Sequence, residues 1–317
     1  MPRPIPRHQV VPLPDDQVSF QIDGRERLRW HFGARYPRPF FYPLIGPSGT
    51  PLTRMGHPGD AGHDHHRSIW FAHHQVAGHD FWSDNSKTHI RQKRWLAYQD
   101  GDAEAAMAVL TGWYAANGQE LIEQELIAAV SNGDDKRLTL PGETLVELQS
   151  TFRPTRPPIE LGKTNFGFLA VRVAKNIAAY FGGGQISDSE GRQGEPAIFG
   201  RAAAWMDYSG PVPGDRTASG GRTEGVTYFD HPANPGHPVH WHVREDGWMG
   251  AAVCLDAART IRREEPLVLR YLLHAHAGPL DPKRAARVAS DFAHRPGYRV
   301  GRSKIKHVGF EISRVGP

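Results

Sequence analysis

Glycine and proline are spread along the whole chain, and they limit it to short regular segments. The sequence has 34 glycines and 26 prolines among its 317 residues. Proline removes a backbone hydrogen-bond donor and glycine favours turns, so both residues interrupt helices. Long helices therefore have little room, and we expect short strands joined by turns.

Several segments have the apolar content and partial alternation that are typical of β-strands. These segments are Val18–Asp23, Leu121–Val130, Thr144–Phe152, Phe168–Val173 and Leu267–His276. Strands at such close spacing predict a sandwich or a barrel. We therefore predict a mainly β fold, namely a large antiparallel β-sandwich with few short helices that forms a single domain over residues 1–317.

Three other segments are assigned from composition. Alanines and arginines cluster over Lys283–His294, which favours a helix. Residues 209–225 are rich in glycine and polar residues and are expected to form a loop. Glu104–Leu110 fits either a helix or a strand.

Charge and cysteine content narrow the classes of protein to consider. The formal net charge is only +4, and no nucleic-acid motif is present, so we expect no nucleic-acid partner. Cys254 is the single cysteine, which excludes an intrachain disulfide and a cysteine-rich zinc site. The N-terminal residues lack an apolar signal region, and no apolar run approaches the roughly 18 residues of a membrane span. We expect a cytoplasmic protein without membrane contacts.

Residues 62–82 form the most unusual segment of the sequence. This stretch of 21 positions holds six of the 18 histidines together with two aspartates and two tryptophans. Histidine titrates near neutral pH and is the commonest metal ligand. The histidines are internal and interleaved with aromatic residues, which indicates a functional site and not an affinity tag.

Pairs of histidines separated by one residue suggest a metal site. Alternate residues of a strand share a face, so each pair would aim two imidazoles at one point. His63, His65 and His242 are the candidate ligands, and such a set would suit Zn, Mn, Fe or Ni. A metal-free polar pocket and unrelated, scattered histidines stay open as alternatives. The three pairs are His63/His65, His240/His242 and His274/His276.

The same segment also fits metal-free acid–base chemistry. A histidine that is oriented by a carboxylate can act as general acid or base near neutral pH. Asp64 and Asp80 are the local carboxylates, and Arg67 could stabilise an enolate or hold a substrate carboxylate. The structural alternative is that Asp64 caps a turn and Arg67 forms an ion pair.

A second polar group lies in the proline-rich segment Tyr228–Arg244. Three prolines restrict this segment, which would make it a rigid wall for a site. The alternative is a crossover in which Asp and Asn form local turns. Its candidate residues are Asp230, His231, Asn234, His237, His240 and His242.

Tryptophans accompany both polar groups. Sugar-binding sites often place an aromatic ring against the apolar face of a pyranose, whereas most tryptophans simply fill cores. The six that we consider are Trp70, Trp82, Trp113, Trp205, Trp241 and Trp248. Motifs for nucleotide binding, zinc proteases and serine hydrolases are absent from the sequence.

The motifs of this chain resemble, in order and spacing, a bacterial family that carries the name methane oxygenase PmoA. The resemblance covers nearly the whole chain. It rests on Phe40–Gly49, His63–His73, Gly78–Trp82, Trp205–Gly210, Phe229–Pro235 and Trp241–Arg244. A methane monooxygenase subunit would be a membrane protein, and this sequence has no spanning segment, so the family name does not describe it.

The resemblance implies a sugar-catabolic protein with a sandwich similar to galactose mutarotase-like folds, which is an analogy of fold. The matching positions that it marks as functional are His63, His65, His66, Arg67, His73, Asp80, Asp230, His231 and His242.

The leading hypothesis is a carbohydrate-active enzyme, an epimerase, lyase or hydrolase that acts on a sugar or keto-sugar through histidine acid–base chemistry, with or without a metal. His65 or His66 would be the base, and His73 or His242 the acid. Arg67 or a metal would stabilise the developing oxyanion.

Substrate contacts are expected from two tryptophans and four polar residues. The tryptophans would stack on the sugar ring and the polar residues would bind its hydroxyls. They are Trp82, Trp241, Asp80, Asp230, His231 and Asn234. Two hypotheses of other classes are a non-catalytic sugar-binding module and a metal-dependent oxygenase, as the family name suggests.

Overall fold

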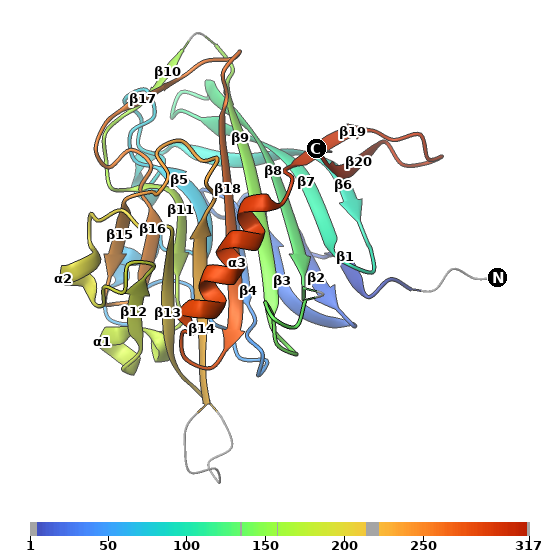
Figure 1. Ribbon diagram of the computed structural model, residues 1–317. Coiled ribbons are helices and arrows are strands. Elements are labelled where there is room, and N and C mark those ends of the chain that lie inside the picture. The colour runs from blue at the N-terminus through green and yellow to red at the C-terminus, as the bar shows by residue number, and fades with distance from the viewer. Residues whose placement is uncertain (1–4, 134, 157, 214–221, 316–317) are drawn as a thin grey trace.

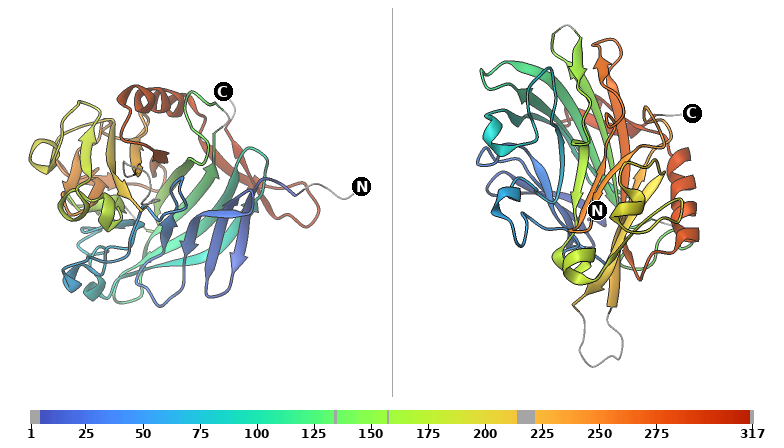
Figure 2. Two further views of the ribbon diagram at one scale, coloured as in Figure 1. Left: turned by 90° about the horizontal axis from the view of Figure 1, so that it is seen from below. Right: turned by 90° about the vertical axis from the view of Figure 1, so that its left-hand side faces the viewer.

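The protein is described by a computed structural model that covers residues 5–133, 135–156, 158–213 and 222–315. Within these residues the strands pair antiparallel in two large sheets that pack face to face (Figure 1, Figure 2). The predicted mainly β, antiparallel sandwich is confirmed. That residues 1–317 form a single domain stays a prediction.

The first sheet carries the N-terminal strands at one end and the candidate site at the other. Its order in the described part of the chain is β1 (His8–Leu13), β2 (Gln17–Ile22), β3 (Arg25–His31), β4 (Phe40–Leu44), β5 (Ile69–His73), β11 (Gly167–Arg172), β16 (Trp248–Ala251) and β15 (Trp241–Arg244).

The second sheet has longer central strands and is covered on its outer face by a helix. Its order in the described part is β12 (Gln185–Asp188), β13 (Trp205–Val212), β14 (Arg222–Asp230), β18 (Leu267–Ala277), β9 (Thr144–Pro154), β8 (Glu120–Ser131), β7 (Ala105–Tyr114) and β6 (His89–Gln99).

Short elements complete the described chain. Two small antiparallel pairs are β10 (Ile159–Leu161) with β17 (Arg259–Ile261), and β19 (Tyr298–Arg302) with β20 (Phe310–Arg314). The helices are α1 (Ala179–Gly182), α2 (Glu195–Ile198) and α3 (Pro282–His294), with 3-10 turns η1 (Ala61–His63), η2 (Asp84–Ser86) and η3 (Lys175–Ile177).

All five predicted strand segments are confirmed as β2, β8, β9, β11 and β18. The ambiguous segment Glu104–Leu110 lies in β7 from residue 105 onward. The predicted loop over 209–225 is wrong at both ends, because β13 continues to Val212 and β14 begins at Arg222. Residues 214–221 of that segment lie outside the described residues.

The main hydrophobic core lies between the two sheets and is rich in aromatic rings. Phe152 of β9 is fully buried, and its ring centroid lies 5.1 Å from that of Phe168 and 5.8 Å from that of Trp113. Phe71 of β5 completes this group at 5.9 Å from Phe152. Side chains from opposite sheets therefore interdigitate at the centre of the sandwich.

The predicted helix over 283–294 is confirmed as α3, one residue longer at its start. Asp281 caps it by accepting hydrogen bonds from the backbone N–H groups of Lys283 and Arg284, and proline follows the cap. Ala285, Val288 and Phe292 recur at helical spacing and are buried against the outer face of the second sheet (Figure 2).

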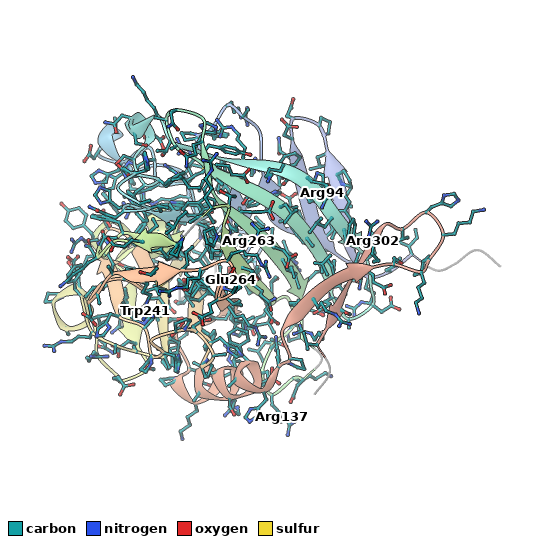
Figure 3. All side chains as sticks on the ribbon, turned by 90° about the horizontal axis from the view of Figure 1, so that it is seen from above. Arg94, Arg137, Trp241, Arg263, Glu264 and Arg302 are labelled. Atoms are coloured by element: carbon teal, nitrogen blue, oxygen red, sulfur yellow. The ribbon has the colours of Figure 1, made fainter. Side chains whose placement is uncertain are left out.

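The hairpin β19–β20 lies at the β6 edge of the second sheet. Arg94 of β6 and Arg302 of β19 both lie over the ring of Phe310, with their guanidinium carbons 5.6 and 5.0 Å from its centroid (Figure 3). The Arg94 contact attaches the hairpin to the sheet edge, whereas the Arg302 contact joins the two strands of the hairpin. Among the described residues, no helix is long and apolar enough to cross a membrane.

Removing the Phe152 ring should destabilise the sandwich strongly. Phe152→Ala leaves a cavity between three aromatic rings, and we expect a loss of about 3–5 kcal/mol in the free energy of unfolding. Val268→Ala on β18 is the control, because Val268 is 38% exposed, and it should cost less than about 1 kcal/mol. Urea denaturation measures both, and equal losses would contradict this account of the core.

Candidate functional site

The site lies on four neighbouring strands of the first sheet, whose side chains alternate between the two faces of the sheet. In β5, Ile69 and Phe71 face the core between the sheets, whereas Trp70 and Ala72 face outward. All five residues of β5 are nevertheless buried. The outer face at this end of the sheet is therefore covered by other parts of the chain.

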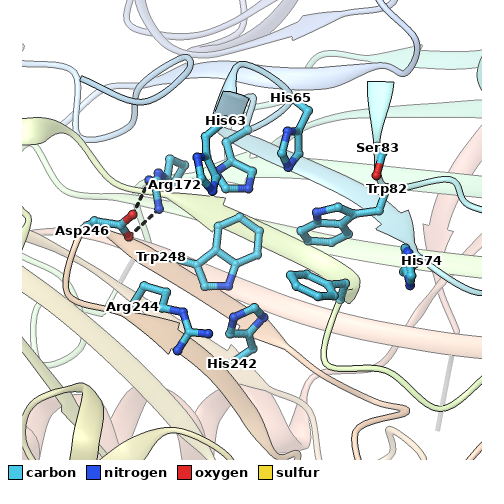
Figure 4. Close-up of a pocket in the computed structure, with 12 residues that line it drawn as sticks. His63, His65, His74, Trp82, Ser83, Arg172, His242, Arg244, Asp246 and Trp248 are labelled. Carbon is cyan, nitrogen blue, oxygen red and sulfur yellow. Dashed lines mark hydrogen bonds and ion pairs between the residues drawn. The ribbon is translucent and has the colours of Figure 1, made fainter. Parts of the chain in front are cut away.

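A pocket of about 370 Å³ lies on this covered outer face (Figure 4). Strands β11, β15 and β16 supply one part of its lining, and the segments around η1 and before η2 supply another. The lining residues are His63, His65, His66, His74, Trp82, Ser83, Phe166, Arg172, His242, Arg244, Asp246 and Trp248.

Three aromatic side chains form an apolar platform in the pocket. The rings of Trp82 and Trp248 are 5.3 Å apart, and Phe166 lies 5.3 Å from Trp82. Trp70 packs behind them at 5.7 Å from Trp82 and 5.2 Å from Trp248. Since Trp70 itself is buried outside the lining, it fixes the platform without reaching a ligand.

Three histidines from the segment around η1 lie together on one side of the platform (Figure 4). The ring of His66 lies 4.9 Å from that of Trp248 and 4.2 Å from that of His65. His63 follows at 5.1 Å from His66, and its Nδ1 lies 2.6 Å from a carboxylate oxygen of Asp60. The histidines that are clustered in the sequence thus lie together in space, and His63, His65 and His66 form one wall of the pocket.

His242 lies across the platform from that wall and has a defined tautomer. Its Nδ1 is 3.1 Å from the backbone carbonyl of Asn165. A carbonyl only accepts, so Nδ1 carries the hydrogen and Nε2 keeps its lone pair. Burial, followed by the charge of Arg244, lowers the pKa of His242 to about 4. The ring is therefore a neutral base at pH 7.

Two imidazoles of the opposite wall, His65 and His66, are also shifted toward the neutral form. Burial lowers the pKa of His66 far below its usual range, and the charge of Arg172 adds to this effect. Burial and the charge of Arg38 lower the pKa of His65. Both rings are therefore uncharged at neutral pH.

An ion-pair network closes the end of the pocket near the β15–β16 turn. Arg172 donates to both carboxylate oxygens of Asp246, at 2.7 and 2.9 Å. The backbone N–H of Gly59 donates to Nδ1 of His57, which leaves the hydrogen on Nε2 to bond Asp246 at 3.1 Å. Burial would raise the pKa of Asp246, but Arg172 outweighs it and the net shift is downward.

Two buried ring nitrogens in the pocket have no partner among the described residues. They are Nε1 of Trp248 and Nδ1 of His66. The two side chains are 2% and 8% exposed, so water cannot easily compensate. Unsatisfied buried polar atoms are costly and uncommon in folded proteins. Their presence in one pocket indicates a place built for a polar ligand.

His73, which the sequence analysis considered as an acid, does not line the pocket. It follows Phe71 by two residues on β5, so it points into the core. Its ring stacks on Phe168 at 4.6 Å and its Nε2 lies 3.1 Å from the carbonyl of Gly162. The next residue, His74, lines the pocket in its place.

Arg67 and Asp80 are also structural in this arrangement. Arg67 forms an ion pair with Asp84 through both terminal nitrogens, and Arg38 shares the same carboxylate. Asp80 accepts hydrogen bonds from the backbone N–H groups of Trp82 and Ser83. It therefore positions Trp82, but it does not line the pocket.

Of the second polar segment, only His242 and Arg244 line the pocket. Asp230 accepts from Asn234 at 2.7 Å and pairs with His237 at 2.8 Å, which holds the proline-rich segment together. His231 packs edge-on against Phe292 of α3. Trp241 points into the core because it alternates with His242, and its indole nitrogen donates to Ala203.

The assignment of substrate contacts to Asp230, His231, Asn234 and Trp241 therefore finds no support in the placement of these residues. Local turns, the alternative interpretation of the segment, describe it better.

The predicted metal site is not assembled. In the part of the chain that the structure describes, no group of three or more His, Cys, Asp or Glu side chains is arranged to hold an ion. His63 and His65 stack with ring centroids 5.8 Å apart, and His242 lies on the other side of Trp248 (Figure 4). These three residues share a pocket without converging on one point.

The pair His274/His276 lies on the other sheet in a buried network. His274 pairs with Glu143 at 2.9 Å and His276 with Asp207 at 2.8 Å. Both histidines are therefore satisfied within the fold and take no part in the pocket.

The sequence analysis did not single out six residues of the lining, which are Arg172, Arg244, Asp246, Phe166, His74 and Ser83. Strand alternation could have identified Arg244. It follows His242 by two residues on a strand, so the two side chains lie on the same face of the sheet. Arg172 and Asp246 come together only through the pairing of β11 with β16 and the turn that precedes β16. No local pattern in the sequence marks that contact.

Comparisons with known proteins identify the family. Residues 17–290 match the model of a family of unknown function, DUF6807, and the chain belongs to this family. No curated protein matches the chain. The resemblance to the methane oxygenase PmoA family stays a prediction.

Two solved structures overlap with most of the chain. One is "a putative mutarotase (YeaD) from Salmonella typhimurium", which covers 87% of this chain and 96% of its own at 12% identity and a TM-score of 0.33. The other is a 4-alpha-glucanotransferase from Thermococcus litoralis, which covers 86% of this chain and 40% of its own at 8% identity and a TM-score of 0.29. Neither similarity identifies an activity for this chain.

Acidification should destabilise the protein through His73. Burial lowers the pKa of His73 from 6.5 to about 4 in the folded state. Above pH 6.5 the ring is neutral in both states, and between 6.5 and 4 only the unfolded chain takes up the proton. Stability therefore falls as the pH falls through this window, by about 2–3 kcal/mol at pH 4.5.

Denaturation in urea at pH 7 and pH 4.5 measures this loss. His73→Gln cannot be protonated and should lose about 2–3 kcal/mol less on acidification than the parent protein. His294→Gln, at the exposed end of α3, is the control. Identical losses in His73→Gln and the parent would contradict the assignment.

Proposed function

We propose that this member of the DUF6807 family binds a monosaccharide-sized carbohydrate in the histidine pocket and moves a proton at one of its carbons. The observation that carries the proposal is the aromatic platform of Trp82, Trp248 and Phe166, which has the neutral ring of His242 on one side and those of His65 and His66 on the other. Its volume of about 370 Å³ falls at the small end of ligand pockets. A platform of aromatic rings suits the apolar face of a sugar ring.

Polar atoms around the platform suit the rest of a sugar. A sugar ring presents hydroxyls at its edge, and these can donate or accept. Nε1 of Trp248 and Nδ1 of His66 have no hydrogen-bond partner among the described residues. Trp248 belongs to the platform, and the His66 ring lies 4.9 Å from it. A bound sugar would satisfy these two atoms while its apolar face covers the indole rings.

His242 has the properties of the base. Its Nε2 lone pair is free, its pKa of about 4 keeps it neutral at pH 7, and the bond to Asn165 fixes the ring. It would remove a proton from a carbon next to the carbonyl of a keto-sugar. The electron pair of that C–H bond would pass to the carbonyl oxygen and form an enolate.

The enolate has two outcomes that conserve atoms and charge. Protonation of the same carbon from the opposite side would give the epimer; the donor would be the minor fraction of His65 that carries a second proton, because His65 lies across the platform from His242 (Figure 4). This leaves His65 neutral and His242 protonated, and proton exchange with water restores both rings. Return of the proton from His242 to a leaving group on the next carbon would give elimination. His66 is poorly suited to be the acid, because burial holds its pKa far below neutral pH.

Arginines of the lining would stabilise the enolate oxygen. The sequence analysis gave this role to Arg67, which is engaged by Asp84. Arg172 and Arg244 reach the pocket instead. Fixed positive groups at a developing oxyanion are commonly the largest contribution to catalysis.

Sugar binding should depend on Trp82. Trp82→Ala removes one ring of the platform and should weaken binding by about tenfold or more, since fully burying such an aromatic side chain contributes over about 1.5 kcal/mol. A panel of hexoses, pentoses and their keto forms is titrated while tryptophan fluorescence is followed. Trp95→Ala on β6 is the control and should leave affinity unchanged. If no sugar of the panel binds the parent protein, the proposal is wrong.

Proton transfer should depend on His242 and not on its neighbour. In D2O, NMR should show replacement of the hydrogen next to the carbonyl of a bound keto-sugar by deuterium. His242→Gln should slow this exchange by about 100-fold or more while binding persists. His240→Gln is the matched control, because His240 pairs with Asp256 outside the pocket.

The pH dependence of the same exchange checks the role of His242. Activity needs the neutral ring, so the rate should hold from pH 8 to 6 and fall as the pH approaches about 4. Binding without any exchange in the parent protein would instead identify a non-catalytic sugar-binding module.

A further inference from the structure

We propose that the corner of the pocket formed by Arg244, Trp248 and His242 binds a carboxylate, so that the ligand is an acidic monosaccharide, a uronate or an aldonate. This inference rests on the proposed function, because it names the class of sugar that the same pocket would take.

Strand pairing brings the three side chains to one place. Arg244 of β15 lies directly opposite Trp248 of β16, and His242 lies opposite Gly250. Residues that face each other across an antiparallel pair, or are two apart on one strand, share a face of the sheet. The rings of His242 and Trp248 are 5.7 Å apart. Figure 4 shows Arg244 and His242 side by side below the Trp248 indole.

Arg244 is held in position with one edge free. Its Nη1 donates to Glu195 at 2.6 Å, and the other oxygen of Glu195 accepts from the backbone of Glu245 at 2.9 Å. The guanidinium also lies over the ring of Phe199 at 4.6 Å. Nε and Nη2 have no protein partner among the described residues, and this edge of a guanidinium donates two parallel hydrogen bonds to a carboxylate.

Trp248 adds a second unused donor. Its Nε1 is buried, lacks a partner in the described part of the chain, and belongs to a side chain of the pocket lining. An indole nitrogen only donates, as a guanidinium does. A hydroxyl could only accept hydrogen bonds from these donors, and its own hydrogen would find no acceptor among them, whereas both oxygens of a carboxylate accept. The chemistry of the corner therefore favours a carboxylate over a neutral sugar edge.

Arg54, Arg172 and Arg244 lie at this end of the pocket with the carboxylates of Asp246 and Glu195, and Glu245 lies near Gly194 beside Glu195. Arg54 bonds only backbone carbonyls among the described residues. The three arginines therefore balance the three carboxylates, and a ligand carboxylate would bind through the unused donors of Arg244 and Trp248. The charge of Arg244 also adds to burial in lowering the pKa of His242, which is consistent with a positive local potential.

The test compares acidic and neutral sugars of the same configuration. Isothermal titration measures the binding of D-glucuronate, D-galacturonate and D-gluconate, and of D-glucose and D-galactose. The parent protein should bind at least one acid about tenfold or more tightly than its neutral counterpart, as a charged hydrogen bond pair predicts. Arg244→Gln should abolish this preference while it keeps any affinity for the neutral sugar.

Controls separate the role of Arg244 from general effects of charge and folding. Arg287→Gln removes an exposed arginine from α3 and should keep the preference. Thermal unfolding confirms that Arg244→Gln is folded. Neutral sugars that bind as well as acids, or a preference that survives in Arg244→Gln, would overturn the carboxylate site and leave the proposed sugar pocket standing. Failure of every sugar to bind the parent protein would overturn both.

Discussion

The burial of one sheet end on both of its faces is the constraint on which the site depends. Strands β5, β11, β16 and β15 pack their inner side chains against the second sheet and their outer side chains under the segments around η1 and η2. Each strand therefore has a core set and a pocket set that differ by one residue. A shift of one position in register would exchange the two sets, as would happen to Trp241 and His242. The packing of the inner side chains in the core therefore determines which side chains of these strands face the pocket.

Alternation also explains what could be predicted from the sequence. The mainly β fold and five strands follow from apolar periodicity, and α3 follows from the alanine and arginine content of its segment. Of the candidate site residues, the structure places His63, His65, His66, His242 and Trp82 around one pocket.

His73 and Trp241 lie outside the pocket for the same reason. Each side chain faces the core, whereas the next residue in the sequence, His74 or His242, lines the pocket. The direction of a strand face depends on which sheet covers it. A sequence with two polar neighbours such as His73 and His74 does not specify that choice.

Arginine pairing was the other part that the sequence did not reveal. Arg67 and Arg172 are both buried next to carboxylates, yet Arg67 meets Asp84 behind the site and Arg172 meets Asp246 at the site. These partners lie 17 and 74 positions away in the chain. Their contacts arise from tertiary packing, so residue type alone could not assign one arginine to structure and the other to the pocket.

Arginine side chains also affect the imidazoles of the pocket without bonding to them. Together with burial, the charges of Arg38, Arg172 and Arg244 hold His65, His66 and His242, respectively, in the uncharged form. A pocket that combines arginine donors with neutral imidazoles can bind an anionic ligand and still keep a lone pair available for a proton. Neither a charged histidine nor an isolated arginine would allow both.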